Sequence, residues 1–215
     1  MTPTEIKVVK RDGESTLLDL EKIHKMVEHA CKDLAGVSES AVEINSGIQL
    51  FDGIKTEDIQ EILIRSANDL ITLENPNYQF VAARLLLFSI RKAVYGEHPD
   101  RHPKLLDHVK KCIDKGVYDK GILDRYTEEE WEQLNSYIDH DRDYLFTYAG
   151  IRQVVDKYLV QDRSTGELFE TPQFMYFMVA ATLFQDDDKF YRLEYIKKYY
   201  DAISKHRINI PTPIM

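Results

Sequence analysis

Residues 8–24 read VVKRDGESTLLDLEKIH, and this stretch decides the fold of the N-terminal half. An extended run turns at Asp12-Gly13 and returns through residues 15–18. Asp-Gly between two extended arms predicts a β-hairpin, because glycine adopts the positive φ that a tight turn requires. A helix is expected to begin near Asp19, so the returning strand should lead directly into it.

Three cationic side chains, Lys10, Arg11 and Lys22, are brought together by this hairpin and the helix that follows. A helix N-terminus leaves unpaired N–H groups that favour anions. Taken alone, the cluster has two interpretations. An ordinary hairpin with a solvated basic tip is the commoner one, and a phosphate-binding site is the other.

The composition fits a globular protein with one large domain or two modest ones. The chain has 215 residues, of which 43% are hydrophobic and 30% are charged. Such values allow a sizeable core and argue against disorder. The net charge of −9 argues against nonspecific binding to nucleic acid or to a membrane surface as the main role.

The two cysteines, Cys31 and Cys112, are far apart in the sequence. They form neither a CxxC pair nor a disulfide framework. The N-terminus lacks the apolar core of a signal peptide, and no apolar run reaches membrane-spanning length. We therefore expect a cytoplasmic protein in a reducing compartment.

Apolar side chains recur at helical spacing throughout the first half, below a short extended piece at Ile54-Lys55. The expected helices cover residues 20–35 (ending at Gly36), residues 38–51, residues 56–71 and a segment from Asn75-Pro76 to Arg91-Lys92. Four helices beneath a small β cap should therefore fill residues 1–96.

The polar segment 97–103, EHPDRHP, contains two prolines and predicts a domain boundary. Beyond it the pattern is again mainly helical. We expect a helix from Leu105 ending at Gly116, a capping box at Thr127–Glu130, a longer helix over 140–158, a hairpin over 159–170 with its turn at 164–166, a very apolar helix from Thr171-Pro172 and a Tyr-rich helix over 189–205.

The run His140-Asp141-Arg142-Asp143 suggests either a metal or acid–base site or a solvated helix cap. Alternating charges favour the cap, and no second cluster supplies further ligands, so no metal site is expected. The chain has no nucleophile motif, P-loop, GxGxxG or HExxH. We therefore expect no self-sufficient catalytic site.

The segments VVKRDG, DLEKIH, DGIKTEDI and PNYQFVAARLLLFSIRKAVYG, in this order, resemble the ATP-cone module. Further along, YDKGILDRYTEEE, IDHDRD, KYLVQDRSTGELFETPQF and NIPTPIM resemble the N-terminal portion of the large subunit of class I (Ia-type) ribonucleotide reductase. The resemblance covers essentially the whole chain. It implies a mainly α fold: a four-helix ATP cone with a β-hairpin cap over 1–96, a helical domain over 97–206, and at 207–215 the first strand of a ten-stranded α/β barrel.

In that family the cone binds ATP as an activator or dATP as an inhibitor, and Mg2+ is expected with the nucleotide. The resemblance places the effector contacts at Lys10, Arg11, Thr16, Leu17, Leu18, Asp19, Leu20, Glu21, Lys22, Thr56, Gln60 and Lys92. Within this set, Lys22 and Lys92 match phosphate contacts. Family members carry Glu, Asn and His where this chain has Thr16, Asp19 and Gln60, and a carboxylate at position 19 should weaken triphosphate binding.

The resemblance also implies a role at the C-terminal end, where Thr212 matches a contact to the substrate nucleotide. The redox and radical-bearing cysteines of the family lie beyond this point, so the chain alone is expected to be inactive. The implied partners are a C-terminal barrel chain, the radical-generating small subunit and further copies of the large subunit, with neither nucleic acid nor membrane. Together they would reduce ribonucleoside diphosphates to deoxyribonucleotides.

Several alternatives stay open at this point. The chain could be a natural split-gene product or a truncated piece. It could also be a stand-alone ATP-cone nucleotide sensor, although an acidic balance and the lack of zinc-ribbon cysteines argue against a DNA-binding regulator. A helical assembly module without a ligand is the third possibility.

Overall fold

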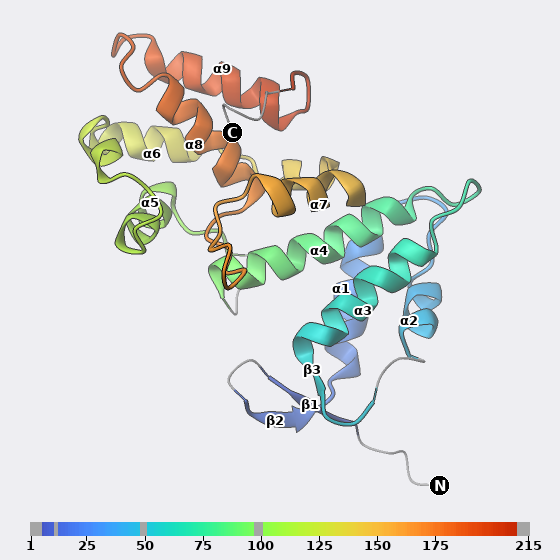
Figure 1. Cartoon of the computed structure of the whole chain (residues 1–215). Helices are drawn as coiled ribbons and strands as arrows, with labels where there is room; N and C mark the ends of the chain where they lie inside the picture. The colour runs from blue at the N-terminus through green and yellow to red at the C-terminus, as the bar shows by residue number, and fades with distance from the viewer. Residues whose placement is uncertain (1–5, 11–12, 48–50, 97–100, 210–215) are drawn as a thin grey trace, which may run out of the picture. The chain divides into compact units, whose positions relative to one another are not determined.

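A computed structural model describes residues 6–10, 13–47, 51–96 and 101–209. The described chain is mainly helical with one small sheet, as the sequence predicted, and it contains no barrel (Figure 1). It divides into two compact units. The first comprises Met1–Ser89 with Phe146–Arg152, and the second comprises Ile90–Leu145 with Gln153–Met215.

The sheet of the first unit has three strands with β1 (Lys7–Val9) in the centre. β2 (Ser15–Leu17) pairs antiparallel with β1 and confirms the hairpin. Gly13, at a φ of 85°, donates from its N–H to the Lys10 carbonyl at 3.0 Å and closes the turn. β3 (Ile54–Lys55) pairs parallel with the other edge of β1, so the sequence-predicted extended piece is a third strand.

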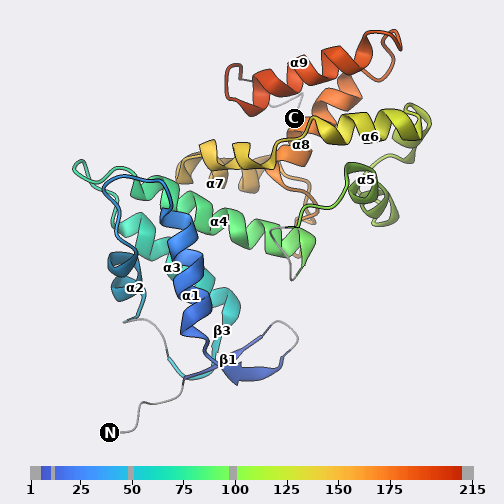
Figure 2. The same cartoon turned by 180° about the vertical axis from the view of Figure 1, so that it is seen from behind.

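Four helices accompany this sheet, and α2 packs against both α1 and α3 (Figure 2). They are α1 (Leu20–Cys31), α2 (Glu39–Gly47), α3 (Thr56–Asp69) and α4 (Tyr78–Tyr95), the last of which continues into the second unit. The prediction that the first helix continues to Gly36 is wrong. The helix ends at Cys31, and Asp33 has a left-handed φ of 60°.

The second unit holds most of the remaining helices. They are α5 (Leu105–Asp114), the 3-10 helix η1 (Lys120–Asp124), α6 (Glu128–Ser136), the 3-10 helix η2 (His140–Leu145), α7 (Tyr148–Lys157, which begins in the first unit), α8 (Pro172–Leu183) and α9 (Arg192–Ser204). The predicted capping box is confirmed, because the side chain of Thr127 and that of Glu130 each bond the other residue's backbone N–H.

One prediction for this unit is wrong in its details. The helix expected over 140–158 is split into η2 and α7, with Phe146 and Thr147 between them. The Thr147 hydroxyl accepts from the Gly150 N–H at 3.3 Å, the contact by which a side chain caps the start of a new helix. The hairpin expected over 159–170 is confirmed: Gln161 and Leu168 form an antiparallel bridge, the Phe169 N–H donates to the Val160 carbonyl at 3.0 Å, and the Asp162 N–H donates to the Glu167 carbonyl at 2.9 Å.

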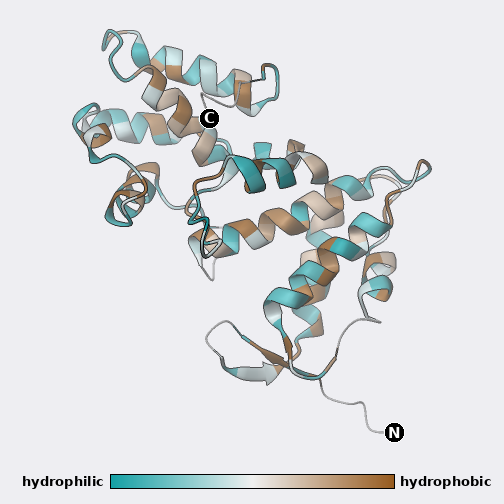
Figure 3. Cartoon of the chain, viewed as in Figure 1, coloured by the Kyte–Doolittle hydropathy of each residue, from teal (hydrophilic) through white to brown (hydrophobic). Residues whose placement is uncertain are grey.

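Helix α8 is the core of the second unit. It is apolar nearly all round (Figure 3), and nine of its residues are buried, so the very apolar helix expected from Thr171-Pro172 is confirmed. α9 packs against it, and the buried Tyr200 ring of α9 lies 5.2 Å from the Phe177 ring of α8. Within the described residues, no helix is both long and apolar enough to span a membrane.

Candidate nucleotide-binding site

The register of the sheet places Lys10 and Thr16 on the same face. Val8 is buried and pairs with Thr16 on one side and with Ile54 on the other. Paired residues share a face of the sheet and side chains alternate along a strand, so Lys10, two residues after Val8, lies on that face too. Val9 pairs with Lys55, which brings Lys10 to the level of Thr56, the first residue of α3.

The start of α1 is fixed by Asp19. Its Oδ1 accepts a hydrogen bond of 3.1 Å from the Lys22 backbone N–H, the usual contact of a helix N-cap. Its Oδ2 lies 3.6 Å from Lys22 Nζ, whose side chain is 85% exposed. The Asp19 carboxylate therefore occupies the anion position at this helix N-terminus.

Lys10 also has a carboxylate beside it. Its Nζ lies 2.7 Å from Oε2 of Glu14, across the hairpin turn, and both side chains are exposed. An exposed ion pair contributes only about 0–1 kcal/mol. An anionic phosphate can therefore displace Glu14 from Lys10, and Asp19 from the ammonium of Lys22, at small cost.

The start of α3 contributes Thr56 and Gln60. Thr56 is half-buried, and Lys55, the N-cap, makes no side-chain cap. Gln60 donates from Nε2 to the Leu85 carbonyl of α4 at 2.8 Å. The Gln60 side chain thus ties α3 to α4, a packing role that the sequence did not predict.

The other sequence-predicted effector residues differ in their surroundings. The side chains of Leu17 and Leu20 are exposed, while the Leu18 N–H donates to the Ile6 carbonyl at 2.8 Å. Glu21 pairs with Lys25 at 2.7 Å. Lys92 is exposed in the last turn of α4 and belongs to the second unit, whereas Arg11 and Thr212 lie outside the described residues.

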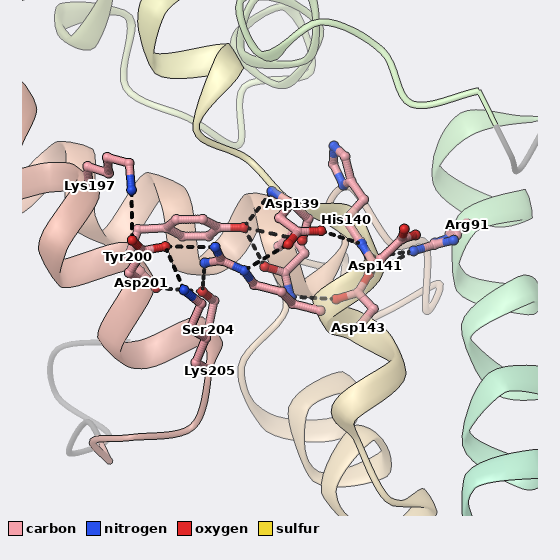
Figure 4. A network of polar contacts seen from close by, with 12 residues as sticks. Arg91, Asp139, His140, Asp141, Asp143, Lys197, Tyr200, Asp201, Ser204 and Lys205 are labelled. Carbon is pink, nitrogen blue, oxygen red and sulfur yellow. Dashed lines mark hydrogen bonds and ion pairs between the residues drawn. The ribbon is translucent and has the colours of Figure 1, made fainter. Parts of the chain in front are cut away.

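Arg91, the neighbour of Lys92, is buried in the core of the second unit. Only 2% of its side chain is exposed, and its guanidinium lies 3.3 Å from Asp143 Oδ2 and donates to the His140 carbonyl at 2.8 Å (Figure 4). The sequence analysis placed Arg91 only at the end of the fourth expected helix and did not predict its burial. The sequence did contain a signal for this burial, because Leu87, Arg91 and Val94 recur at the spacing of one buried helix face.

The same network corrects the interpretation of residues 140–143 as a solvated cap. Asp143 is buried, and its Oδ1 accepts from Gln173 Nε2 at 2.9 Å. Gln173 Oε1 in turn accepts from the Tyr200 hydroxyl at 2.7 Å. Burial raises the pKa of Asp143 to about 6, even though Arg91 acts in the opposite direction. These hydrogen bonds hold η2, α8 and α9 together. In the described part of the chain, no group of three or more His, Cys, Asp or Glu residues could hold a metal ion.

Comparison with known proteins finds two matched segments in the chain. Residues 6–93 match the ATP cone domain, and residues 144–215 match the family described as ribonucleotide reductase, all-alpha domain. The chain is 49% identical over 208 residues to ribonucleoside-diphosphate reductase 1 subunit alpha of Escherichia coli, covering 97% of this chain and 27% of that protein. The chain is 48% identical to ribonucleoside-diphosphate reductase subunit alpha of Haemophilus influenzae, and the alignment covers 98% of this chain and 28% of that protein. It is 41% identical to the subunit alpha of Enterobacteria phage T4, and that alignment covers 98% of this chain and 27% of the phage protein.

The hairpin and the capped helix behind it lie within the segment that matches the ATP cone domain, so the chain contains an ATP cone. More particularly, the chain corresponds to the N-terminal region of the alpha subunit of class I ribonucleotide reductases, with an ATP cone and an all-alpha domain. It spans about a quarter of the length of the curated relatives that it matches.

Proposed function

We propose that the segment matching the ATP cone domain, residues 6–93, binds ATP or dATP, with Mg2+, as an allosteric effector at the junction of the hairpin and α1. The observation that carries this proposal is the sheet register, which puts Lys10 and Thr16 on one face and brings Lys10 to the start of α3. The whole arrangement falls within the segment that matches the ATP cone domain. Cations beside helix N-termini are a favourable setting for a triphosphate.

Each part of the site has a proposed task. Lys22 and Lys92 contact phosphates, and Lys10 reaches the nucleotide from the hairpin. Thr56 contributes its hydroxyl at the start of α3, and the exposed apolar side chain of Leu17 is available to the base or sugar. The remaining proposed contacts are Arg11, Leu18, Asp19, Leu20, Glu21 and Gln60.

Asp19 limits the affinity in this proposal. Its carboxylate caps α1 and lies close to the ammonium of Lys22, so it repels a phosphate that approaches the same helix end. Gln60 is held by the Leu85 carbonyl, which restricts the directions in which its amide can face a nucleotide.

For the whole protein, we propose that this region belongs to a ribonucleoside-diphosphate reductase large subunit. Assembled with the catalytic barrel portion and the radical-generating small subunit, it contributes to the reduction of ribonucleoside diphosphates to deoxyribonucleotides. In that assembly Thr212 contacts the substrate nucleotide, and large subunits associate with one another. The 215 residues alone are expected to show no reductase activity.

Isothermal titration calorimetry of the chain with ATP, dATP and CTP in the presence of Mg2+ tests the effector site. We expect both adenine nucleotides to bind, and CTP to bind more weakly. No heat of binding with ATP or dATP at millimolar concentration would contradict the proposal. Equal binding of all three would show phosphate attraction without a base site.

A further inference from the structure

The second unit contains a half-open cavity of about 460 Å3 beside α8. Its wall is formed mostly by apolar side chains from α8 and from the segments before α6 and after α7. These are Val117, Ile122, Val160, Met175, Met178, Val179 and Leu183. Methionine side chains adapt to the shape of a partner, and two of them lie here. The cavity is therefore suited to receive an apolar group.

One buried acid, Glu170, also lines this cavity. Only 2% of Glu170 is exposed, and its Oε1 accepts from the Val160 N–H at 2.8 Å, while its other oxygen accepts from the Tyr118 hydroxyl. Burial raises the pKa of Glu170 to about 7. A carboxylate has room for about four hydrogen bonds, so Glu170 retains capacity to accept further ones.

Exposed apolar side chains also lie at the end of α8, in the turn that follows it and at the start of α9. We call Leu183, Phe190, Tyr191 and Tyr195 the α8–α9 ridge; all four are exposed, and Phe190 is 90% exposed. The rings of Tyr191 and Tyr195 stack at 6.2 Å. Leu183, at the end of α8, also lines the cavity. Grouped exposed apolar side chains of this kind mark interaction sites.

We propose that the cavity and the α8–α9 ridge form the docking surface for the portion of the large subunit that the relatives carry beyond this region, with an apolar side chain of that portion entering the cavity and a lysine or arginine reaching Glu170. The inference rests on the proposed function. The chain covers 27% of its Escherichia coli relative, so a neighbouring portion about three times larger is available to cover this surface. A docked cation would keep Glu170 ionised and would complement its charge, because its two hydrogen-bond partners, the Tyr118 hydroxyl and the Val160 N–H, are neutral. Arg125 also lines the cavity, but it pairs with Asp186.

Binding of the chain to the remaining portion of the Escherichia coli alpha subunit, measured by sedimentation velocity, tests the proposal. Phe190→Ser removes an exposed ridge side chain without touching the core, and Val179→Arg fills the cavity. Each should weaken association by at least about tenfold, the usual effect of losing a central contact. Leu73→Ser is the matched control, because Leu73 is 97% exposed on the first unit, and it should bind as the unaltered chain does.

Glu170→Gln keeps the side-chain shape but cannot attract a cation, so it should also weaken association, by about tenfold. The fluorescence of the single tryptophan, Trp131, buried in the same unit, reports whether each variant is folded. Wild-type binding by either Phe190→Ser or Glu170→Gln would overturn the docking surface as stated.

Two further outcomes would also overturn it. One is failure of the unaltered chain to bind the remaining portion. The other is self-association of the chain that Phe190→Ser abolishes, because the ridge would then belong to a second copy. Calorimetry with ATP on the same samples separates this inference from the effector site. If the chain binds ATP but does not dock, the effector site is supported and the docking surface is rejected. If it docks but does not bind ATP, the docking surface is supported and the effector site is rejected.

Discussion

Replacing Lys22 by alanine should weaken ATP binding by about one to two decades. The Lys22 side chain is 85% exposed and pairs only loosely with Asp19, at 3.6 Å, so it is free to reach a phosphate. A charge-assisted hydrogen bond contributes about 1.5–3 kcal/mol, and the exposed pair that it replaces contributes about 0–1 kcal/mol. Each 1.4 kcal/mol corresponds to about tenfold in affinity.

The helix itself should survive this change. Asp19 caps α1 through the backbone N–H of Lys22, and that bond does not depend on the side chain. Isothermal titration calorimetry with MgATP on the purified variant measures the effect, and circular dichroism checks that the helices are intact.

Lys25→Ala is the matched control. Lys25 lies on the same helix one turn later, is exposed and pairs with Glu21 at 2.7 Å, so its loss removes the same charge at a different place. Its affinity for ATP should change less than that of the Lys22 variant. An unchanged affinity in Lys22→Ala, or an equal loss in both variants, would refute a direct phosphate contact at Lys22.

Three further predictions concern Asp19 and the buried charges. Asp19→Asn keeps a good N-cap while removing a negative charge, so calorimetry should show about three- to tenfold tighter ATP binding, and weaker binding would contradict this account. Arg91→Ala leaves the Asp143 carboxylate buried without its cation and should lower the free energy of unfolding of the second unit by about 3–5 kcal/mol, measured by urea unfolding with Trp131 fluorescence. The pKa of Glu170 is raised to about 7 from 4.5, so the folded state holds its proton more tightly. Stability should therefore fall as pH rises from 4.5 to 7, by about 3 kcal/mol more in the unaltered chain than in Glu170→Gln, and parallel pH profiles would contradict the burial effect.

Local chemistry explains which parts of the fold could be predicted. The turn glycine Gly13, the helix start at Thr56 and the capping box at Thr127 each depend on residues within a few positions, and each is present. The pairing of β3 with β1 joins residues 46 positions apart, Val8 with Ile54 and Val9 with Lys55, through a strand of only two residues. No local pattern specifies such a pairing, so the sequence predicted the extended piece but not its partner.

The same distinction applies to the site residues. Lys10 and Lys22 stood out because cations beside a turn and a helix start are visible in a short stretch of sequence. The ion pair of Lys10 with Glu14 depends on how the hairpin closes, and it needed the structure. Arg91 meets Asp143 at a separation of 52 residues, so the helical spacing that places Arg91 in a buried stripe could not reveal which side chain it pairs with.

Hydrogen exchange with and without MgATP tests most directly whether the nucleotide binds at the junction of the hairpin and α1. We expect slower amide exchange in β2, in the first turns of α1 and at the start of α3, because these segments carry Thr16, Lys22 and Thr56. A protein that binds ATP in calorimetry but shows unchanged exchange in these three segments would contradict the account.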